Sequence, residues 1–295
     1  MTDPALGPFE PRLVRQRKRR ARGTFRDASF LHARVVADLA DRLEVIPRPF
    51  PRLLALGGGG LFSEEIRSRP ELSARIGSIL ETDLDFIDPE HLPFAPGSFE
   101  LIVSPLALHW INDLPGALIQ LRVALKPDGL LLASLFGGDT LSELRLSLIE
   151  AESELTGGAG PRVSPFADLQ DIAGLLQRAG FALPAADRDV VTVRYGEPMK
   201  LLADLRAMGE TSALRERNPR ALSRRVLARA FEIYHERFSD EDSRVRATFE
   251  ILTVTGWSPH ESQQKPLKPG SAKTRLADAL KTTEHRTDDK ANPTQ

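Results

Sequence analysis

Four consecutive glycines, Gly57 to Gly60, follow a short apolar run and precede a stretch with helical periodicity. Glycine adopts positive φ and leaves no Cβ in the path of a ligand, and the N-terminus of the following helix favours negative charge. A strand, a glycine turn and a helix in this order hold a nucleotide at the carboxyl end of the first strand of an open α/β sheet. The chemistry predicted here is the binding of a nucleotide-like cofactor.

A histidine and a tryptophan, His109 and Trp110, follow an apolar strand at the sheet edge where a substrate would meet that cofactor. A histidine there can move a proton or orient a substrate, because its unperturbed pKa is near neutrality. A hydrogen-bonded histidine beside a core tryptophan explains the pair equally well. Asp113 follows them and has the sequence context of a helix N-cap. These three residues are the candidate catalytic group.

Further polar residues follow the later strands. Gly138 and Asp139 come directly after the strand at 130–136, on the same edge, although Asp139 is also suited to cap the next helix. His260 and Glu261 lie beyond the last strand in a segment without a packing pattern, and loop residues carry function more often than core residues do. We assign these residues to the substrate side of the site.

Apolar periodicity predicts the elements that must position these residues. A strand, a helix and a strand in succession imply right-handed parallel crossovers, and two late strands separated by helices imply a closing antiparallel pair. The predicted fold is α/β, with a doubly wound, mostly parallel sheet, an antiparallel final strand and a helical insertion. Strands are expected at 51–56, 74–80, 99–104, 130–136, 189–195 and 246–257, and helices at 27–45, 62–69, 114–125, 140–155, 167–179, 198–208 and 219–238.

The composition bounds the class of protein. The chain has 295 residues, of which 41% are hydrophobic. Its 40 basic and 41 acidic residues nearly cancel, so the net charge does not favour binding to nucleic acid. It has no cysteine, which excludes disulfides and zinc–thiolate sites. No apolar run approaches the roughly 20 residues of a membrane span, and no apolar leader opens the chain. A cytoplasmic protein is therefore expected.

Three regions are expected along the chain: a disordered or basic arm at 1–26, one domain at 27–258 with a helical insertion at about 198–240, and an extended polar tail at 259–295. Seven of the eleven residues from Arg12 to Arg22 are basic. This run is interpreted as a solvated arm or the start of a helix, and alternatively as a contact for an acidic partner, nucleic acid or lipid headgroups.

Taken together, the motifs resemble class I S-adenosylmethionine-dependent methyltransferases, which have a Rossmann-like fold. The match runs from the glycine turn through LPFAPGSFELIVSPLALHW and LKPDGLLL to the last strand. Within that superfamily the chain is most similar to the methyltransferase-fold assembly factors of respiratory complex I that hydroxylate an arginine, and to their bacterial relatives. The segments that carry this similarity are LALHWINDLP, FGGDTLSELR, SPF, LLQRAGF and GWSPHESQQKP. A more distant resemblance is to methyltransferases that esterify malonyl-carrier protein.

The resemblance implies S-adenosylmethionine as the cofactor. Ala55 stands where the superfamily usually has an acid before the first glycine, Leu61 stands at the later glycine, and Glu81 or Asp83 must supply the ribose-binding carboxylate. The implied cofactor side consists of Ala55, Gly57, Gly58, Gly59, Asp83, Asp88 and Ser104. The implied substrate side consists of Gly138, Asp139, Pro165, Phe166, His260 and Glu261.

The predicted function is modification of a protein side chain, by methyl transfer or by arginine hydroxylation, with a complex I subunit as the implied partner. The alternatives are a catalytically degenerate assembly protein and a methyltransferase for a carrier-bound or free small acid. A monomer or weak dimer is expected, in the cytoplasm or at the periphery of the inner membrane. Hydroxylation commonly uses iron held by two histidines and a carboxylate. No compact ligand spacing supports that site, and no metal is predicted; the available side chains are His109, His260, Asp113, Asp139 and Glu261.

Overall fold

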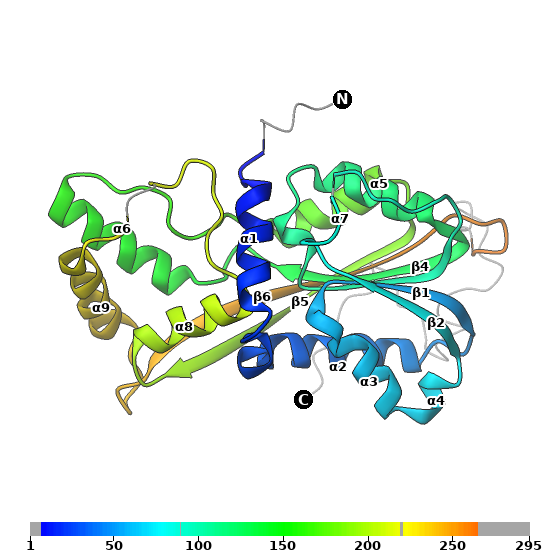
Figure 1. Cartoon of the computed structure of the whole chain (residues 1–295), viewed down its shortest axis with the longest axis horizontal. Coiled ribbons are helices and arrows are strands. Elements are labelled where there is room, and N and C mark those ends of the chain that lie inside the picture. Colours follow the sequence, from blue (N-terminus) through cyan, green and yellow to red (C-terminus); the bar gives the residue numbers. More distant parts are fainter. Residues whose placement is uncertain (1–6, 89, 219–220, 265–295) are drawn as a thin grey trace, which may run out of the picture. The chain divides into compact units, whose positions relative to one another are not determined.

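The computed structural model describes residues 7–88, 90–218 and 221–264. Residues 1–260 form one compact unit, and residues 261–295 form a second, of which only 261–264 are described. The first unit is built on a six-stranded sheet in the order β2-β1-β3-β4-β6-β5 (Figure 1). The strands are β1 (Phe50–Leu56), β2 (Ile76–Thr82), β3 (Phe99–Pro105), β4 (Leu125–Phe136), β5 (Ala182–Tyr195) and β6 (Val245–Trp257).

The strand directions confirm the predicted fold class. Strands β1 to β4 run parallel, and β6 pairs antiparallel with both β4 and β5. Buried parallel strands are apolar on both faces, and β1 is an example: Leu53 packs into one core and Leu54 into the other, with neither exposed to solvent. The carboxyl ends of β1 to β4 therefore lie on one edge, where the glycine turn, Asp83, His109 and Gly138 follow their strands. The end of β6, which precedes the predicted substrate-side residue His260, lies at the opposite edge, because Trp257 pairs with Leu130.

Helices cover both faces of the sheet. Helices α2 and α3 lie on one face with α6, α8 and α9, and helices α5 and α7 lie on the other (Figure 1). The α-helices are α1 (Pro11–Ala21), α2 (Phe30–Glu44), α3 (Leu61–Ser68), α4 (Pro70–Ser73), α5 (Leu114–Ala124), α6 (Ser142–Thr156), α7 (Leu169–Arg178), α8 (Pro198–Met208) and α9 (Arg224–Phe238). Short 3₁₀ turns are η2 (Phe25–Ala28), η3 (Gly58–Gly60) and η4 (Leu108–Trp110). Within the described residues, no helix is long and apolar enough to cross a bilayer.

Two strands are longer than the periodicity predicts. Strand β4 begins at Leu125, five residues before the predicted start at 130, and includes residues 127–129 in a register shift, with Asp128 at φ 61°. Strand β5 begins seven residues before the predicted start. Its first half has few strand-forming residues, but β6 pairs along it, and Asp187 and Asp189 form ion pairs with arginines of α2. Tertiary contacts therefore extend β5 over a segment whose sequence alone does not predict a strand.

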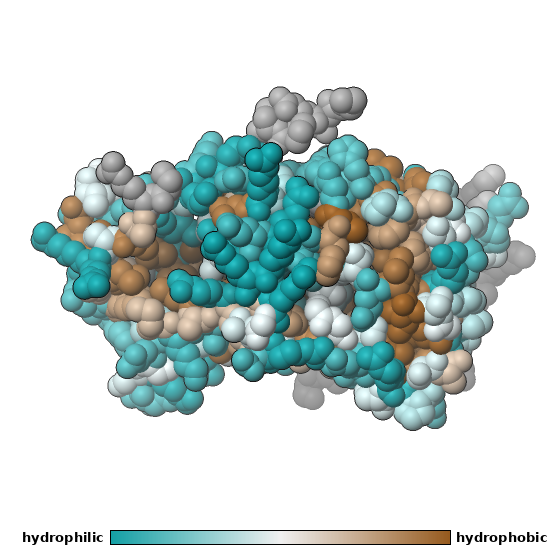
Figure 2. Space-filling view, viewed as in Figure 1, coloured by the Kyte–Doolittle hydropathy of each residue, from teal (hydrophilic) through white to brown (hydrophobic). Residues whose placement is uncertain are grey.

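The basic run forms helix α1 over Pro11–Ala21. Its outward side is hydrophilic (Figure 2), whereas Val14 and Ala21 are buried. Lys18, four residues after Val14, lies on the same face, and its side chain is only 11% exposed. The helix packs against α8, so this part of the expected arm belongs to the compact unit. Residues 1–6 of the arm and 265–295 of the expected tail lie outside the described residues.

Candidate functional site

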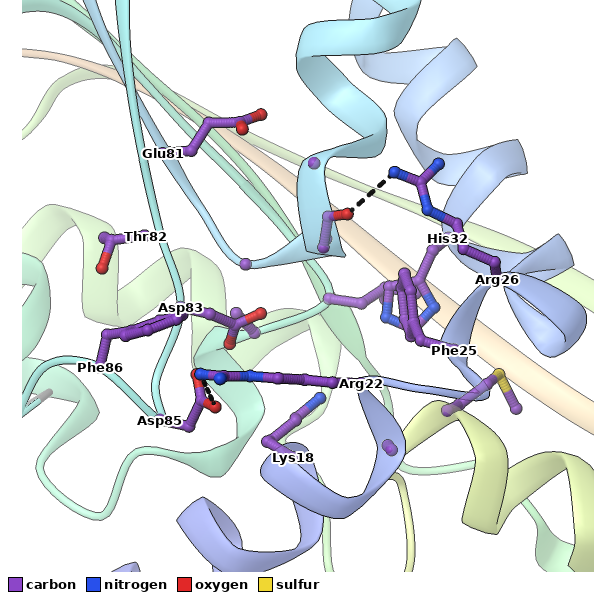
Figure 3. A pocket seen from close by; sticks show the side chains of 18 residues that line it. Lys18, Arg22, Phe25, Arg26, His32, Glu81, Thr82, Asp83, Asp85 and Phe86 are labelled. Carbon is purple, nitrogen blue, oxygen red and sulfur yellow. Dashed lines mark hydrogen bonds and ion pairs between the residues drawn. The ribbon is translucent and has the colours of Figure 1, made fainter.

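A cavity of about 390 Å³ lies at the carboxyl ends of β1 and β2, beneath the connection from α1 to α2 (Figure 3). Its volume falls in the range of small-molecule and cofactor sites. One wall is the glycine turn, a second is the segment after β2, and a third comes from α1, η2 and α2. The lining residues are Lys18, Ala21, Arg22, Phe25, Arg26, His32, Gly57, Gly58, Gly59, Gly60, Glu81, Thr82, Asp83, Asp85, Phe86, Leu106, Ala107 and Met208.

The glycine turn requires glycine for steric reasons. All four residues have positive φ, between 57° and 92°. A Cβ on Gly57 would lie 2.7 Å from the Cβ of Ala107, and one on Gly58 would lie 2.6 Å from Cγ of Pro105. Both distances are too short for real side chains, so the backbone itself forms this wall. The turn thus offers a ligand a surface of main-chain atoms.

The predicted cofactor residues divide into two groups. Gly57, Gly58, Gly59 and Asp83 line the cavity, and so does Glu81, the alternative ribose ligand. The residues that do not line it are Ala55, Asp88 and Ser104.

Each residue of the second group has another environment. Ala55 is buried inside the sheet, in register with Glu81 of β2. Asp88 is exposed and lies 3.3 Å from Nδ1 of His91. Ser104 is buried and donates a hydrogen bond to the carbonyl of Leu56 at 3.0 Å. The structure therefore places Glu81 and Asp83, rather than these three, beside the glycine turn.

Three cations on the opposite wall were missed by sequence reasoning. Lys18, Arg22 and Arg26 are spaced by four residues and all face the cavity (Figure 3). Arg22 forms an ion pair with Asp85 and lies 4.1 Å above the ring of Phe86. Arg26 donates to the carbonyl of Gly59 at 3.3 Å. The four-residue spacing of Lys18 and Arg22 inside the basic run is the signal that could have identified these two cations, whereas Arg26 lies beyond the run, in η2.

A buried carboxylate, that of Glu210, connects Lys18 of the cavity wall with His109 and Trp110. It follows α8, where Gly209 at φ 76° ends the helix. One carboxylate oxygen lies 2.6 Å from Nζ of Lys18, and the other lies 3.0 Å from Nε2 of His109 and accepts from Nε1 of Trp110 at 2.9 Å. The sequence contains no local signal for these contacts, because Lys18 and Glu210 are 192 residues apart.

The pKa shifts follow from burial and from these partners. Burial opposes ionisation of Glu210, but Lys18 and His109 outweigh it and hold the pKa of this carboxyl well below its usual range. Burial lowers the pKa of His109, and Glu210 only partly offsets that effect. Burial also acts on Lys18, but Glu210 and nearby aspartates raise the pKa of this ammonium. The cluster therefore contains an ammonium, a carboxylate and a neutral imidazole at pH 7.

The predicted catalytic residues do not all come together. His109 and Trp110 share Glu210 as hydrogen-bond acceptor. The His109 ring also lies 4.9 Å from that of Phe136 and 5.8 Å from that of Phe166. Asp113 instead caps α5, where its carboxylate accepts from a backbone N–H at 2.9 Å.

A second cavity, of about 900 Å³, lies beside α6 and the loop that follows it. Three of the predicted substrate-side residues, Gly138, Pro165 and Phe166, line it. Asp139 does not: its backbone N–H donates to Glu250 at 2.8 Å, and its carboxylate points to Arg188 at 3.4 Å. Phe166, which lines the second cavity, also contacts the ring of His109.

The last two predicted substrate-side residues follow β6. His260 is exposed at the end of the first unit, and Glu261 is exposed in the second. Among the described residues, no three His, Asp or Glu side chains gather in a way that could hold a metal ion.

Comparisons with known proteins place the chain in a family. Residues 69–133 match the family model described as "Methyltransferase domain". The arginine-hydroxylase NDUFAF5 of Danio rerio is 40% identical over 266 residues, which cover 85% of this chain and 82% of that protein. The chain belongs to the NDUFAF5 family. The human NDUFAF5 is 39% identical over 256 residues, 82% of this chain and 74% of that protein.

A second group of relatives is named for methyl transfer. The malonyl-[acyl-carrier protein] O-methyltransferase of Gallionella capsiferriformans is 30% identical over 276 residues, covering 85% of this chain and 92% of that protein. The resemblance to the S-adenosylmethionine-dependent methyltransferase superfamily, and within it to the NDUFAF5 family, is therefore confirmed.

Proposed function

We propose that this chain binds S-adenosylmethionine in the cavity at the glycine turn and modifies an arginine side chain of a protein partner. The observation that carries the proposal is the cavity wall itself, in which main-chain atoms of Gly57 and Gly58 face two carboxylates at the end of β2. The name of the NDUFAF5 relatives supports arginine as the modified residue.

The residues present fit this cofactor. Glu81 is exposed toward the cavity and is suited to accept the two ribose hydroxyls, with Asp83 beside it. Arg26 forms an ion pair with Glu64 and also contacts the carbonyl of Gly59. The remaining N–H groups of its guanidinium are suited to bind the carboxylate of the methionine part. Phe86 offers an aromatic face beside Arg22 for the adenine. When bound, S-adenosylmethionine supplies an electrophilic methyl group.

The substrate side of the proposed site is the second cavity. The second cavity, with Pro165 and Phe166, is the proposed entry for the side chain to be modified. A respiratory complex I subunit is the proposed partner, met in the cytoplasm or at the periphery of the inner membrane by a monomer or weak dimer of this chain. Nucleic acid is not part of the proposal. No iron site is proposed; ferrous iron is added in the experiment below only to measure its effect on the product.

Intact-mass spectrometry tests this function. The full chain is incubated with S-adenosylmethionine and a complex I subunit peptide that contains one arginine, in air, with and without ferrous iron and ascorbate. A gain of one oxygen supports hydroxylation and a gain of one methyl supports transfer; the same peptide with lysine in place of arginine should stay unchanged.

Two other results would replace the proposal. An unmodified peptide together with no cofactor binding would favour the catalytically degenerate assembly or binding protein. A methyl gain on malonyl-acyl carrier protein, with none on the arginine peptide, would favour the carrier-protein reaction of the Gallionella relative.

A further inference from the structure

We propose that Glu210 is a positioning residue that fixes His109 as its Nε2–H tautomer and so presents Nδ1 of His109 as a hydrogen-bond acceptor for an N–H group of the substrate. The identity of that donor rests on the proposed function, since an arginine guanidinium carries only donors. The tautomer itself depends on the geometry of Glu210 alone.

The donors around Glu210 fix the direction of its hydrogen bonds. Nε1 of Trp110 and Nζ of Lys18 can only donate, and both lie within 2.9 Å of the carboxylate. The carboxylate is ionised and has no proton to give. Nε2 of His109, 3.0 Å away, must therefore carry the proton in the neutral ring.

The other ring nitrogen has no partner. Nδ1 of His109 is buried and makes no hydrogen bond within the described residues. A buried polar atom without a partner costs free energy of about 1–3 kcal/mol, and such atoms are rare in folded proteins. In a side chain that is 1% exposed, this free acceptor points to a role that is completed only when another molecule binds.

The position of His109 fits that role. On one side its ring contacts Phe166, which lines the second cavity. On the other side Glu210 links it to Lys18, which lines the cofactor cavity. His109 itself lines neither cavity, but its contacts reach a lining residue of each, and the rings of Phe136 and Phe166 beside it offer aromatic edges and faces to a guanidinium.

Burial keeps His109 neutral, although Glu210 raises its pKa. Glu210 faces it from the segment after α8, Lys18 from α1 and His32 from α2. Burial is the largest influence on the pKa of His109 and lowers it, so the Nδ1 lone pair remains available at pH 7.

Long-range ¹H–¹⁵N NMR spectra of the uniformly labelled full chain test the tautomer, with His109 assigned by comparison with His109→Gln. We expect a protonated Nε2 and an unprotonated Nδ1 in the wild type. In Lys18→Met/Glu210→Leu, both buried charges are replaced by apolar groups, and a mixture of tautomers is expected. A protonated Nδ1 in the wild type would overturn the proposal.

Glu210→Gln preserves the side-chain shape and takes the place of the double variant if that variant does not fold. The amide oxygen of Gln is a weaker acceptor than a carboxylate, so the fraction of His109 protonated at Nδ1 should rise. An unchanged Nε2–H pattern in every folded Glu210 variant would also overturn the proposal. Formation of the arginine product should fall at least about tenfold from the wild type to Glu210→Gln. If the wild type forms no product, the proposed function fails, while the spectra still decide the tautomer.

Discussion

Glu210→Leu should lower the free energy of unfolding by about 3–5 kcal/mol, because it removes one partner from a buried ion pair. The ammonium of Lys18 would lose its partner at 2.6 Å, and the N–H donors of His109 and Trp110 would lose their common acceptor. Asp83 and Asp85 also attract Lys18, which favours the lower end of this range. Urea unfolding followed by circular dichroism at pH 7 measures the change.

Two controls separate the ion pair from burial alone. Glu143 is as buried as Glu210, at 8% exposure, but it accepts from Thr248 and from the hydroxyl of Ser142 and forms no ion pair among the described residues. Glu143→Leu should therefore cost less, about 1–3 kcal/mol. Lys18→Met/Glu210→Leu should be more stable than Glu210→Leu, because no buried charge is left unpaired. Equal losses for Glu143→Leu and Glu210→Leu would show that the cluster is not coupled as described.

His32→Leu should reduce the decrease in the free energy of unfolding that the protein shows as the pH falls. Burial, followed by repulsion from Lys18, lowers the pKa of His32 to about 3. The unfolded histidine takes up a proton near pH 6.5 and the folded one only near pH 3, so stability falls as the pH drops through that window. Between pH 6.5 and 4.5 the wild type should lose about 2–3 kcal/mol that His32→Leu does not lose, at 1.36 kcal/mol per pH unit.

The window is chosen to isolate this histidine. Glu210 has a depressed pKa, so its contribution is present above about pH 4.5 and is lost only at lower pH. His109 contributes with the same sign as His32, and remains in both proteins. His235→Leu, at an exposed position on α9, is the matched control and should leave the slope unchanged. Parallel acid profiles for the wild type and His32→Leu would contradict the burial of an uncharged His32.

The parts of the fold that were predictable are those with a local signal. The glycine turn is recognisable because only glycine fits its φ angles, and β3 because both of its faces are buried and apolar. The first half of β5 has no such pattern and is held by β6 and by ion pairs with α2. The start of β5 could therefore not be predicted from strand propensity.

The candidate site was only partly predictable for the same reason. His109 and Trp110 were identified from their place after a strand, but their common partner Glu210 is about 100 residues away in sequence. Lys18 is one of seven basic residues in a run and differs from its neighbours only by its spacing from Val14. Such contacts arise from tertiary packing, which a single sequence does not encode locally.

Calorimetric titration of the full chain with S-adenosylmethionine tests the central claim, that the cavity at the glycine turn is a cofactor site. The wild type should bind in the micromolar range, and Glu81→Ala should weaken binding by about 10–100-fold, because charge-assisted hydrogen bonds to the ribose are lost. Glu71→Ala removes an exposed carboxylate of α4 and should bind like the wild type. Absence of binding at millimolar cofactor in the wild type, or equal affinity in Glu81→Ala, would contradict the account.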